Sequence, residues 1–215
     1  MPIVYPKGLG FRENEDRLHQ PVFDLTVLIQ CIFSHHLAVF GGGRILDPDA
    51  NISLPTRHLP QVIGVPSTGA LTIALRNDPC PIVYMSITPD PERTLKFNSS
   101  NDAMTRVYTN TIIPIFLAFY ERYRPWIVAK FNRDTTTWPD IFQFARVVRN
   151  AVGHRARIDW NNANLGLVSW KGLTYSHTDN QREIFETDLS VGDLLVLMVE
   201  MSDRLDGLEC PLDPP

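Results

Sequence analysis

The sequence predicts a mainly α protein, a four-helix bundle with a proline-rich insertion of loops and short strands between its first two helices. Two observations carry this prediction. Apolar residues recur with the 3.6-residue period of a helix in four segments. Eleven of the seventeen prolines lie in residues 1–100, where they interrupt any long helix. At this length the chain can bury a core, and we expect a single domain over residues 1–215.

The first predicted helix covers about residues 23–40 and ends at three consecutive glycines, residues 41–43. The proline-rich insertion follows over about residues 41–100. Within it, residues 69–75 and 82–87 form either a short helix or strands, because apolar runs this short do not reveal a period.

The second predicted helix covers about residues 102–123 and contains Pro114, which should kink it. The third covers about residues 139–154. It begins at the pair Trp138 and Pro139, because proline is favoured in the first turn of a helix.

The fourth predicted helix covers about residues 190–206. Ser190 is its N-cap, Asp193 stands three residues further on, and Gly207 ends the helix. Before it, residues 167–175 place aromatic and β-branched residues around a Lys-Gly step, a pattern that predicts a small hairpin or an extended loop.

The composition is that of an ordinary globular protein, because 44% of the residues are apolar and 20% are charged. No apolar stretch is long enough to cross a bilayer, and the first residues do not resemble a signal peptide. We therefore expect a cytoplasmic protein without membrane contact. Cys31, Cys80 and Cys210 lie far apart in the sequence and should be reduced thiols.

Charge is distributed unevenly along the chain. The net charge of −4 argues against a general nucleic-acid binder. Residues 122–157, however, hold eight Lys or Arg against two acidic residues, so this segment carries +6 and the remainder −10. Such asymmetry either focuses an anion on one surface or marks a solvated helical face.

One chemically specific feature stands at the end of the third predicted helix, where Arg149, Asn150 and His154 follow one another. Asn150 and His154 are four residues apart and share a helix face, so the amide can orient the imidazole. Arg149 lies about 140° around the helix from His154. Two copies of the helix facing each other across a two-fold axis would bring these groups together most simply, which indicates a homodimer.

These side chains are suited to phosphate chemistry. An arginine fork matches phosphate oxygens and stabilises the charge of a five-coordinate phosphorus, while histidine transfers protons near neutral pH. The nearest acids, Asp140 and Asp159, are not at metal-ligand spacing. We therefore expect no metal and no cofactor. RNA is the expected substrate, because its 2′-hydroxyl supplies the nucleophile.

Residues 145–154 resemble the R-x(4-6)-H motif of the HEPN superfamily, which stands at the end of the third helix of a four-helix bundle. Arginine followed directly by asparagine matches the common form of that motif. The Trp-containing turn at 168–170 and the last helix are also similar to those of some bacterial HEPN-like proteins. The resemblance covers about residues 102–207, with residues 23–40 as the first helix, and leaves the insertion unexplained.

The resemblance implies a dimeric, metal-independent RNA endonuclease that leaves a cyclic phosphate. Arg149 and His154 would be catalytic, and Asn150 would position them. Many such proteins act as toxins or in phage defence, some beside an antitoxin or nucleotidyltransferase partner. The candidate substrate-binding residues are Arg146, Arg155, Arg157 and Tyr175.

Other interpretations stay open at this stage. Arg149 and His154 could simply complement the helix dipole, with Gly153 as the terminator. A helix that ends at Gly153 would turn His154 away from Asn150. Tyr175 could pack over the end of the bundle instead of stacking on a base. The protein could also be a non-catalytic HEPN-like module that binds RNA or another protein, or a structural subunit whose motif builds a dimer interface.

Overall fold

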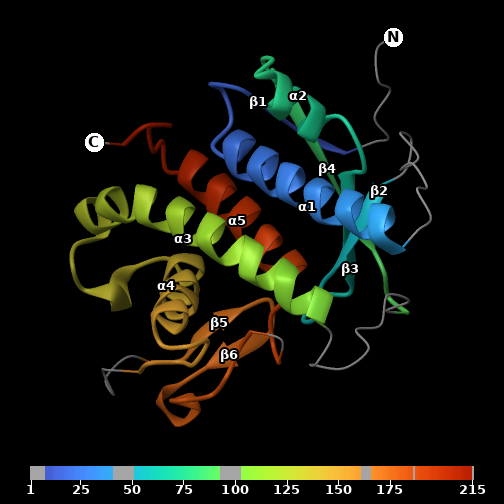
Figure 1. The fold of residues 1–215 in the computed structure, drawn as a ribbon. Coiled ribbons are helices and arrows are strands. Elements are labelled where there is room, and N and C mark those ends of the chain that lie inside the picture. The colour runs from blue at the N-terminus through green and yellow to red at the C-terminus, as the bar shows by residue number, and fades with distance from the viewer. Residues whose placement is uncertain (1–7, 41–50, 93–102, 161–165, 186, 215) are drawn as a thin grey trace. The chain divides into compact units, whose positions relative to one another are not determined.

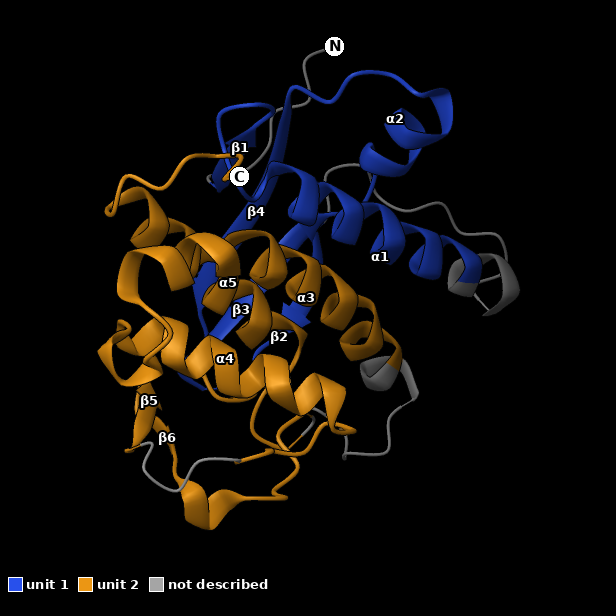
Figure 2. Ribbon diagram, turned by 90° about the vertical axis from the view of Figure 1, so that its left-hand side faces the viewer, with its two compact units in different colours: residues 1–56, 60–96 blue, residues 57–59, 97–215 orange. Residues whose placement is uncertain are grey.

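The computed structural model describes residues 8–40, 51–92, 103–160, 166–185 and 187–214. The chain divides by its contacts into two compact units, coloured separately in Figure 2. Unit 1 consists of Met1–Thr56 and Pro60–Lys96, and unit 2 of Arg57–Leu59 and Phe97–Pro215. Whether the two units fold as one domain, as the chain length predicts, stays a prediction.

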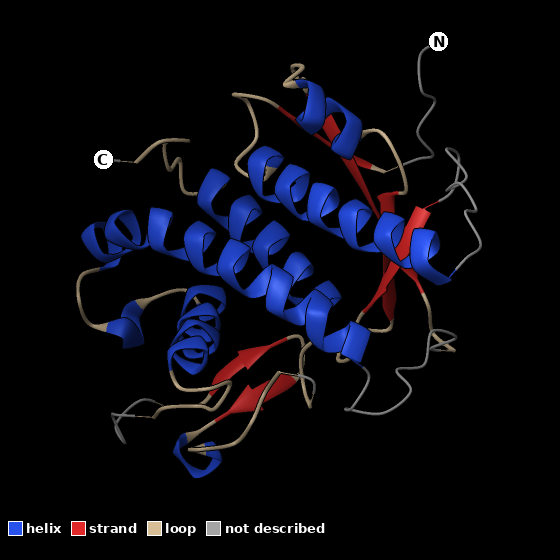
Figure 3. Cartoon of the chain, in the orientation of Figure 1, coloured by secondary structure: helices blue, strands red, loops and turns tan. Residues whose placement is uncertain are grey.

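Unit 1 contains a four-stranded antiparallel sheet in the order β1-β4-β3-β2 (Figures 1 and 3). Helix α1 packs against β4 and against the short helix α2. The elements are β1 (Leu9–Arg12), α1 (His19–Phe40), β2 (Asn51–Pro55), β3 (Gln61–Pro66), α2 (Ala70–Arg76) and β4 (Ile82–Pro89).

Prolines delimit the strands of this sheet. Pro55, Pro66 and Pro89 are the last residues of β2, β3 and β4, while Pro60 and Pro81 immediately precede β3 and β4. Proline is tolerated at a strand end because few ladder hydrogen bonds are lost there. The dense prolines that argued against a long helix therefore mark the ends of short strands.

The predicted fold class, a mainly α four-helix bundle, is wrong, because the described chain combines helices with this sheet. The first predicted helix does form, as α1, but Leu25 and Ile29 bury its apolar face within a unit that contains the sheet. A stripe of apolar residues with helical spacing shows that one side of the helix is buried. It does not show whether another helix or a sheet covers that side.

The described part of the insertion is also more ordered than predicted. It forms β2, β3, α2 and β4, and the two undecided segments are the helix α2 and the strand β4. The glycine run at 41–43 and the insertion residues 44–50 and 93–100 lie outside the described residues.

Unit 2 carries the other three predicted helices, which are confirmed. Helix α3 packs against α4 and α5, and α4 also packs against α5 and β5. Helix α3 continues through Pro114 and Pro125 and ends well beyond the predicted boundary. The elements are α3 (Ala103–Phe131), the 3₁₀ turn η1 (Thr135–Thr137), α4 (Asp140–Gly153), β5 (Val168–Trp170), β6 (Leu173–Tyr175), the 3₁₀ turn η2 (His177–Asp179) and α5 (Val191–Asp206).

The predicted hairpin is the antiparallel pair β5 and β6. Lys171 and Gly172 connect the strands with φ angles of 47° and 86°. Two consecutive positive φ values give the tight turn that matches the twist of a hairpin, and glycine adopts the second without steric cost. Among the described residues, no helix combines the length and apolar character needed to cross a membrane.

A buried carboxylate organises the start of α5. Ser190 and Asp193 form the predicted capping box, in which the Asp193 carboxylate accepts hydrogen bonds from the Ser190 backbone and hydroxyl, each at 2.9 Å. The same fully buried carboxylate accepts backbone N–H groups of Arg57 at 2.6 Å, His58 at 3.2 Å and Leu59 at 3.1 Å. Asp193 therefore ties residues 57–59 to the N-terminus of α5 within unit 2.

We expect Asp193→Asn to lower the free energy of unfolding by roughly 2–3 kcal/mol, because the amide keeps the shape but loses the charge that strengthens these hydrogen bonds. Urea denaturation followed by circular dichroism measures the effect. An unchanged midpoint would contradict the organising role of Asp193.

Asp203→Asn, on the exposed side of the same helix, is the matched control. Burial raises the pKa of Asp203, and the nearby carboxylates of Asp206 and Glu200 raise it further. A raised pKa means that the charged form is less favourable in the folded chain than in the unfolded one. This control should therefore be equally or slightly more stable at neutral pH, and the difference should vanish once both states are protonated in acid.

Candidate anion-binding site

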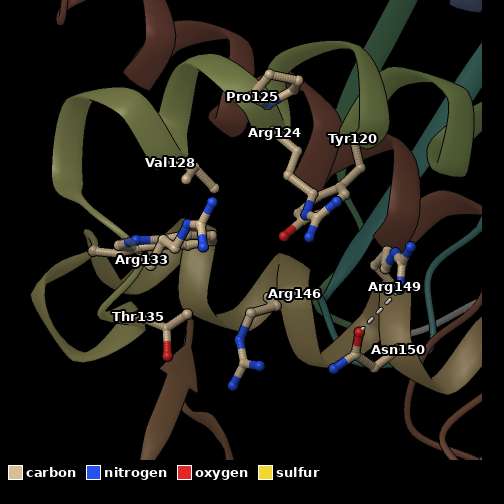
Figure 4. A pocket seen from close by; sticks show the side chains of 10 residues that line it. Tyr120, Arg124, Pro125, Val128, Arg133, Thr135, Arg146, Arg149 and Asn150 are labelled. Atoms are coloured by element: carbon tan, nitrogen blue, oxygen red, sulfur yellow. Dashed lines mark hydrogen bonds between the residues drawn. The ribbon is translucent and has the colours of Figure 1, made fainter.

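A cavity of about 570 Å³ lies within unit 2, between α3, α4 and the segment that connects them (Figure 4). Among the described residues, four arginines line it and no carboxylate does. We call it the arginine pocket. Its lining residues are Tyr120, Arg124, Pro125, Val128, Arg133, Thr135, Trp138, Arg146, Arg149 and Asn150.

Helix α4 positions one wall of the pocket through its amphipathic pattern. Phe142, Ala145 and Val148 are completely buried along one face. Arg146, Arg149 and Asn150 stand on the remaining face, partly exposed, and line the cavity. The 3.6-residue period that buries the apolar face thus also sets the direction of the polar groups.

Helix α3 and the connecting segment supply the other walls. Figure 4 shows Tyr120 and Arg124 directed from α3 into the space above α4, and Arg133 reaching in from the connecting segment. Asp134 shapes this segment by accepting the backbone N–H and the hydroxyl of Thr136, at 3.0 and 2.7 Å. These hydrogen bonds lower the pKa of Asp134 and keep its carboxylate engaged with the turn.

Glu121 partly compensates the positive charge beside the pocket. Its Oε1 accepts the Arg149 Nε at 2.5 Å, and its Oε2 lies 3.6 Å from Arg124. A second Arg149 nitrogen donates to the Asn150 Oδ1 at 3.3 Å. Two of the four guanidinium groups therefore share one carboxylate, which fixes the orientation of Arg149.

Two buried polar atoms at the pocket have no hydrogen-bond partner in the described residues: the Tyr120 hydroxyl and the Arg146 Nε. Burial lowers the pKa of Arg146. Burial raises the pKa of Tyr120 to about 12, so its hydroxyl stays protonated at neutral pH. An unpaired buried polar group costs about 1–3 kcal/mol, and a ligand that accepts hydrogen bonds would recover this energy.

His154, the third member of the sequence motif, is not among the residues that line the pocket. Helix α4 ends at Gly153, and His154 follows as its C-cap with φ −115° and ψ 39°. Its side chain is half exposed, and its Nε2 lies 3.0 Å from the Asp159 Oδ2. The structure therefore pairs His154 with Asp159, and it gives Arg149 and Asn150 a separate set of contacts.

Local backbone geometry explains this separation. Arg155 and Ala156 have positive φ angles of 58° and 67°, and the Ala156 N–H bonds back to the Ala151 carbonyl at 2.9 Å. The chain therefore turns directly after Gly153, and the i, i+4 relation expected between Asn150 and His154 does not continue through a helix.

The candidate substrate-binding residues have different environments. Arg146 lines the pocket, and Arg155 is exposed. Arg157 donates to the Gln181 carbonyl at 3.1 Å and lies 3.8 Å from Glu183, so its charge is already partly matched.

Tyr175 belongs to the core of unit 2. It is fully buried, it stacks on Phe144 at 5.5 Å, and its hydroxyl donates to Asp188 at 3.0 Å. Burial and the adjacent Asp188 carboxylate raise the pKa of Tyr175 far above its ordinary range. Its ring is therefore covered by protein on the side where a base would stack.

Sequence reasoning missed several pocket residues, notably Tyr120, Arg124, Arg133 and Trp138. Arg124 and Arg133 belong to the basic segment 122–157, which predicted a positive surface without saying which cations form it, whereas Tyr120 and Trp138 had no signal in the sequence. Four of the eight cations in this segment line the pocket, whereas Arg122, for example, pairs with Asp213. The packing of α4 beside α3 decides which of these cations line the pocket.

The chain was compared with models of known protein families, with curated proteins and with solved structures, and none of the three comparisons found a match. The resemblance of residues 145–154 to the HEPN motif therefore stays a prediction. Among the described residues, no group of three or more His, Cys, Asp or Glu side chains is arranged to hold a metal ion.

We expect inorganic phosphate to stabilise the protein, because a ligand that binds only the folded state raises the melting temperature. At about ten times Kd the increase should be about 3 °C for a chain of this size. Differential scanning fluorimetry measures it, with sodium chloride at equal ionic strength as the reference. Arg146→Gln should abolish the increase, whereas the exposed Arg204→Gln on α5 should keep it. Equal increases in both variants would refute an anion site in the pocket.

Proposed function

We propose that unit 2 binds RNA through the arginine pocket. The observation that carries this proposal is the convergence of four guanidinium groups on one cavity that no carboxylate of the described chain lines. Guanidinium groups present fixed pairs of donors that match phosphate oxygens. The remainder of the chain is acidic, so a phosphate ligand would be attracted to this site and repelled elsewhere.

The pocket also has walls that suit the rest of a nucleotide. Pro125, Val128 and Trp138 add apolar surface beside the arginines. A mixed lining of this kind favours a ligand that carries both a charged group and a sugar or base over a simple inorganic ion. The alternative of a non-catalytic RNA-binding module is consistent with this pocket alone.

A second candidate function, metal-independent RNA cleavage, is favoured by the contact between His154 and Asp159. A carboxylate that holds one imidazole nitrogen orients the other for proton transfer. In the proposed step His154 accepts the proton of the 2′-hydroxyl and the 2′-oxygen attacks the adjacent phosphorus. The bond to the 5′-oxygen breaks, water protonates that oxygen, and a cyclic phosphate remains. Arg149 from the second copy of a homodimer would stabilise the extra negative charge on phosphorus.

A homodimer in which two copies of the end of α4 share a cleft remains part of this proposal, as does a cytoplasmic location, where RNA is available. A role as a toxin or in phage defence, with an antitoxin or nucleotidyltransferase partner, rests on the resemblance of the motif alone.

RNA binding is tested by fluorescence anisotropy with a labelled single-stranded oligonucleotide at several salt concentrations. Replacing both Arg133 and Arg146 by Gln should weaken binding by about tenfold or more. It should also reduce the dependence of log Kd on log salt by up to about 1.4, because two phosphate contacts are lost. Arg204→Gln is the matched control and should bind like the wild type. If the double variant retains the wild-type affinity, RNA does not use the arginine pocket.

Cleavage is tested by incubating the protein with RNA and with an all-deoxy strand of the same sequence in the presence of a chelator. Only RNA should be cut, and His154→Ala should reduce kcat by about 100-fold or more. Asp159→Asn should lower kcat while leaving RNA affinity unchanged, because the carboxylate positions the imidazole and lies outside the arginine pocket. Binding of RNA without any cutting would reject the second candidate and favour the non-catalytic module.

A further inference from the structure

The charge and the hydrogen-bonding capacity of the arginine pocket indicate which part of an RNA it receives. An internal phosphodiester carries a single negative charge and has two free oxygens. A terminal phosphomonoester carries about −1.5 to −2 at neutral pH and has three free acceptor oxygens. The pocket therefore discriminates between the two if it offers more charge and more donors than a diester can use.

The charge count favours the monoester. Glu121 is engaged by Arg149 and Arg124. Arg133 and Arg146 have no acidic partner within the described part of the chain. At least two positive charges on the pocket wall thus lack a counter-charge, and a dianionic group would neutralise both.

The unused donors lead to the same conclusion. The Tyr120 hydroxyl and the Arg146 Nε are both buried and have no hydrogen-bond partner among the described residues. They belong to side chains that line the pocket from α3 and from α4, respectively. Donors on two different walls can be satisfied together by a group with three free oxygens, whereas a diester presents two oxygens and must direct both of its ester links outward.

The size of the cavity allows more than a bare phosphate. A volume of about 570 Å³ falls in the range of pockets that enclose a small organic ligand. Beside the arginines, Pro125, Val128 and Trp138 offer an apolar wall for the attached nucleoside.

We propose that the arginine pocket recognises a phosphomonoester on a nucleotide, at the end of an RNA strand or on a free mononucleotide, with Arg146 and Tyr120 as the specificity-determining residues. This inference rests on the proposed RNA-binding function and deepens it, because it names the chemical group on the RNA that the pocket recognises. An RNA that ends in hydroxyl groups would bind more weakly than the same RNA with a terminal phosphate.

The test compares one RNA sequence in three forms, with a 5′-phosphate, with a 3′-phosphate and with hydroxyl groups at both ends, each labelled at an internal base. Wild-type protein should bind one of the phosphorylated forms about tenfold or more tightly than the hydroxyl form. The preference should decline as the pH falls below about 6, where the monoester takes up a proton and loses its second charge. Competition with a nucleoside monophosphate distinguishes a strand end from a free nucleotide as the preferred source.

Two variants assign the preference to the pocket. Arg146→Gln should reduce the ratio of affinities to nearly one. Tyr120→Phe removes only a hydroxyl without a hydrogen-bond partner in the described part of the chain, so it should fold normally and still lose part of the preference. Arg204→Gln should keep the full ratio. The melting temperature of each variant verifies that the fold is retained.

The outcomes separate this inference from the function on which it rests. RNA binding through the pocket with no preference for a phosphorylated end would overturn the inference and leave the proposed function intact. Binding of the nucleoside monophosphate without RNA binding would reject the RNA proposal and support phosphomonoester recognition. Absence of binding by every form would overturn both.

Discussion

Four guanidinium groups of like charge surround one cavity in unit 2, and the packing of α3 beside α4 must hold them there against their mutual repulsion. Apolar burial supplies the opposing force, since Phe116 on α3 and Phe142 on α4 are completely buried. Glu121 offsets part of the charge by engaging Arg149 and Arg124. The unsatisfied remainder is the basis of the proposed anion binding, because an anion in the pocket would offset charge that costs stability in the free protein.

The end of α4 separates two chemical roles that the sequence motif combines. Arg149 and Asn150 precede Gly153 and share the pocket, whereas His154 follows it and contacts Asp159. The two proposed roles, binding of phosphate and transfer of a proton, therefore fall to residues in different surroundings, one a cavity and one half exposed. The proposed RNA binding does not depend on the proposed cleavage for this reason.

Local signals predicted the helices well. The capping box of Ser190 and Asp193 and the Lys171-Gly172 turn depend on neighbours in the sequence, so their geometry could be predicted without tertiary information. The sheet of unit 1 was missed for the opposite reason. Its strands are short and are bounded by prolines, and β1 pairs with β4, which lies far along the chain. The sheet forms only when such strands pair, so no single short segment carries a pattern that reveals it.

The sequence by itself located the four long helices, although not the end of α3, and it showed that basic residues concentrate in residues 122–157 and that Arg149 and Asn150 stand on a polar helix face. Tertiary structure alone decided which cations meet. Arg133 and Arg146 converge because the chain reverses between α3 and α4, while Tyr175 enters the core. Periodicity sets the direction of a side chain relative to its own helix, but the position of a second helix depends on the burial of both apolar faces together.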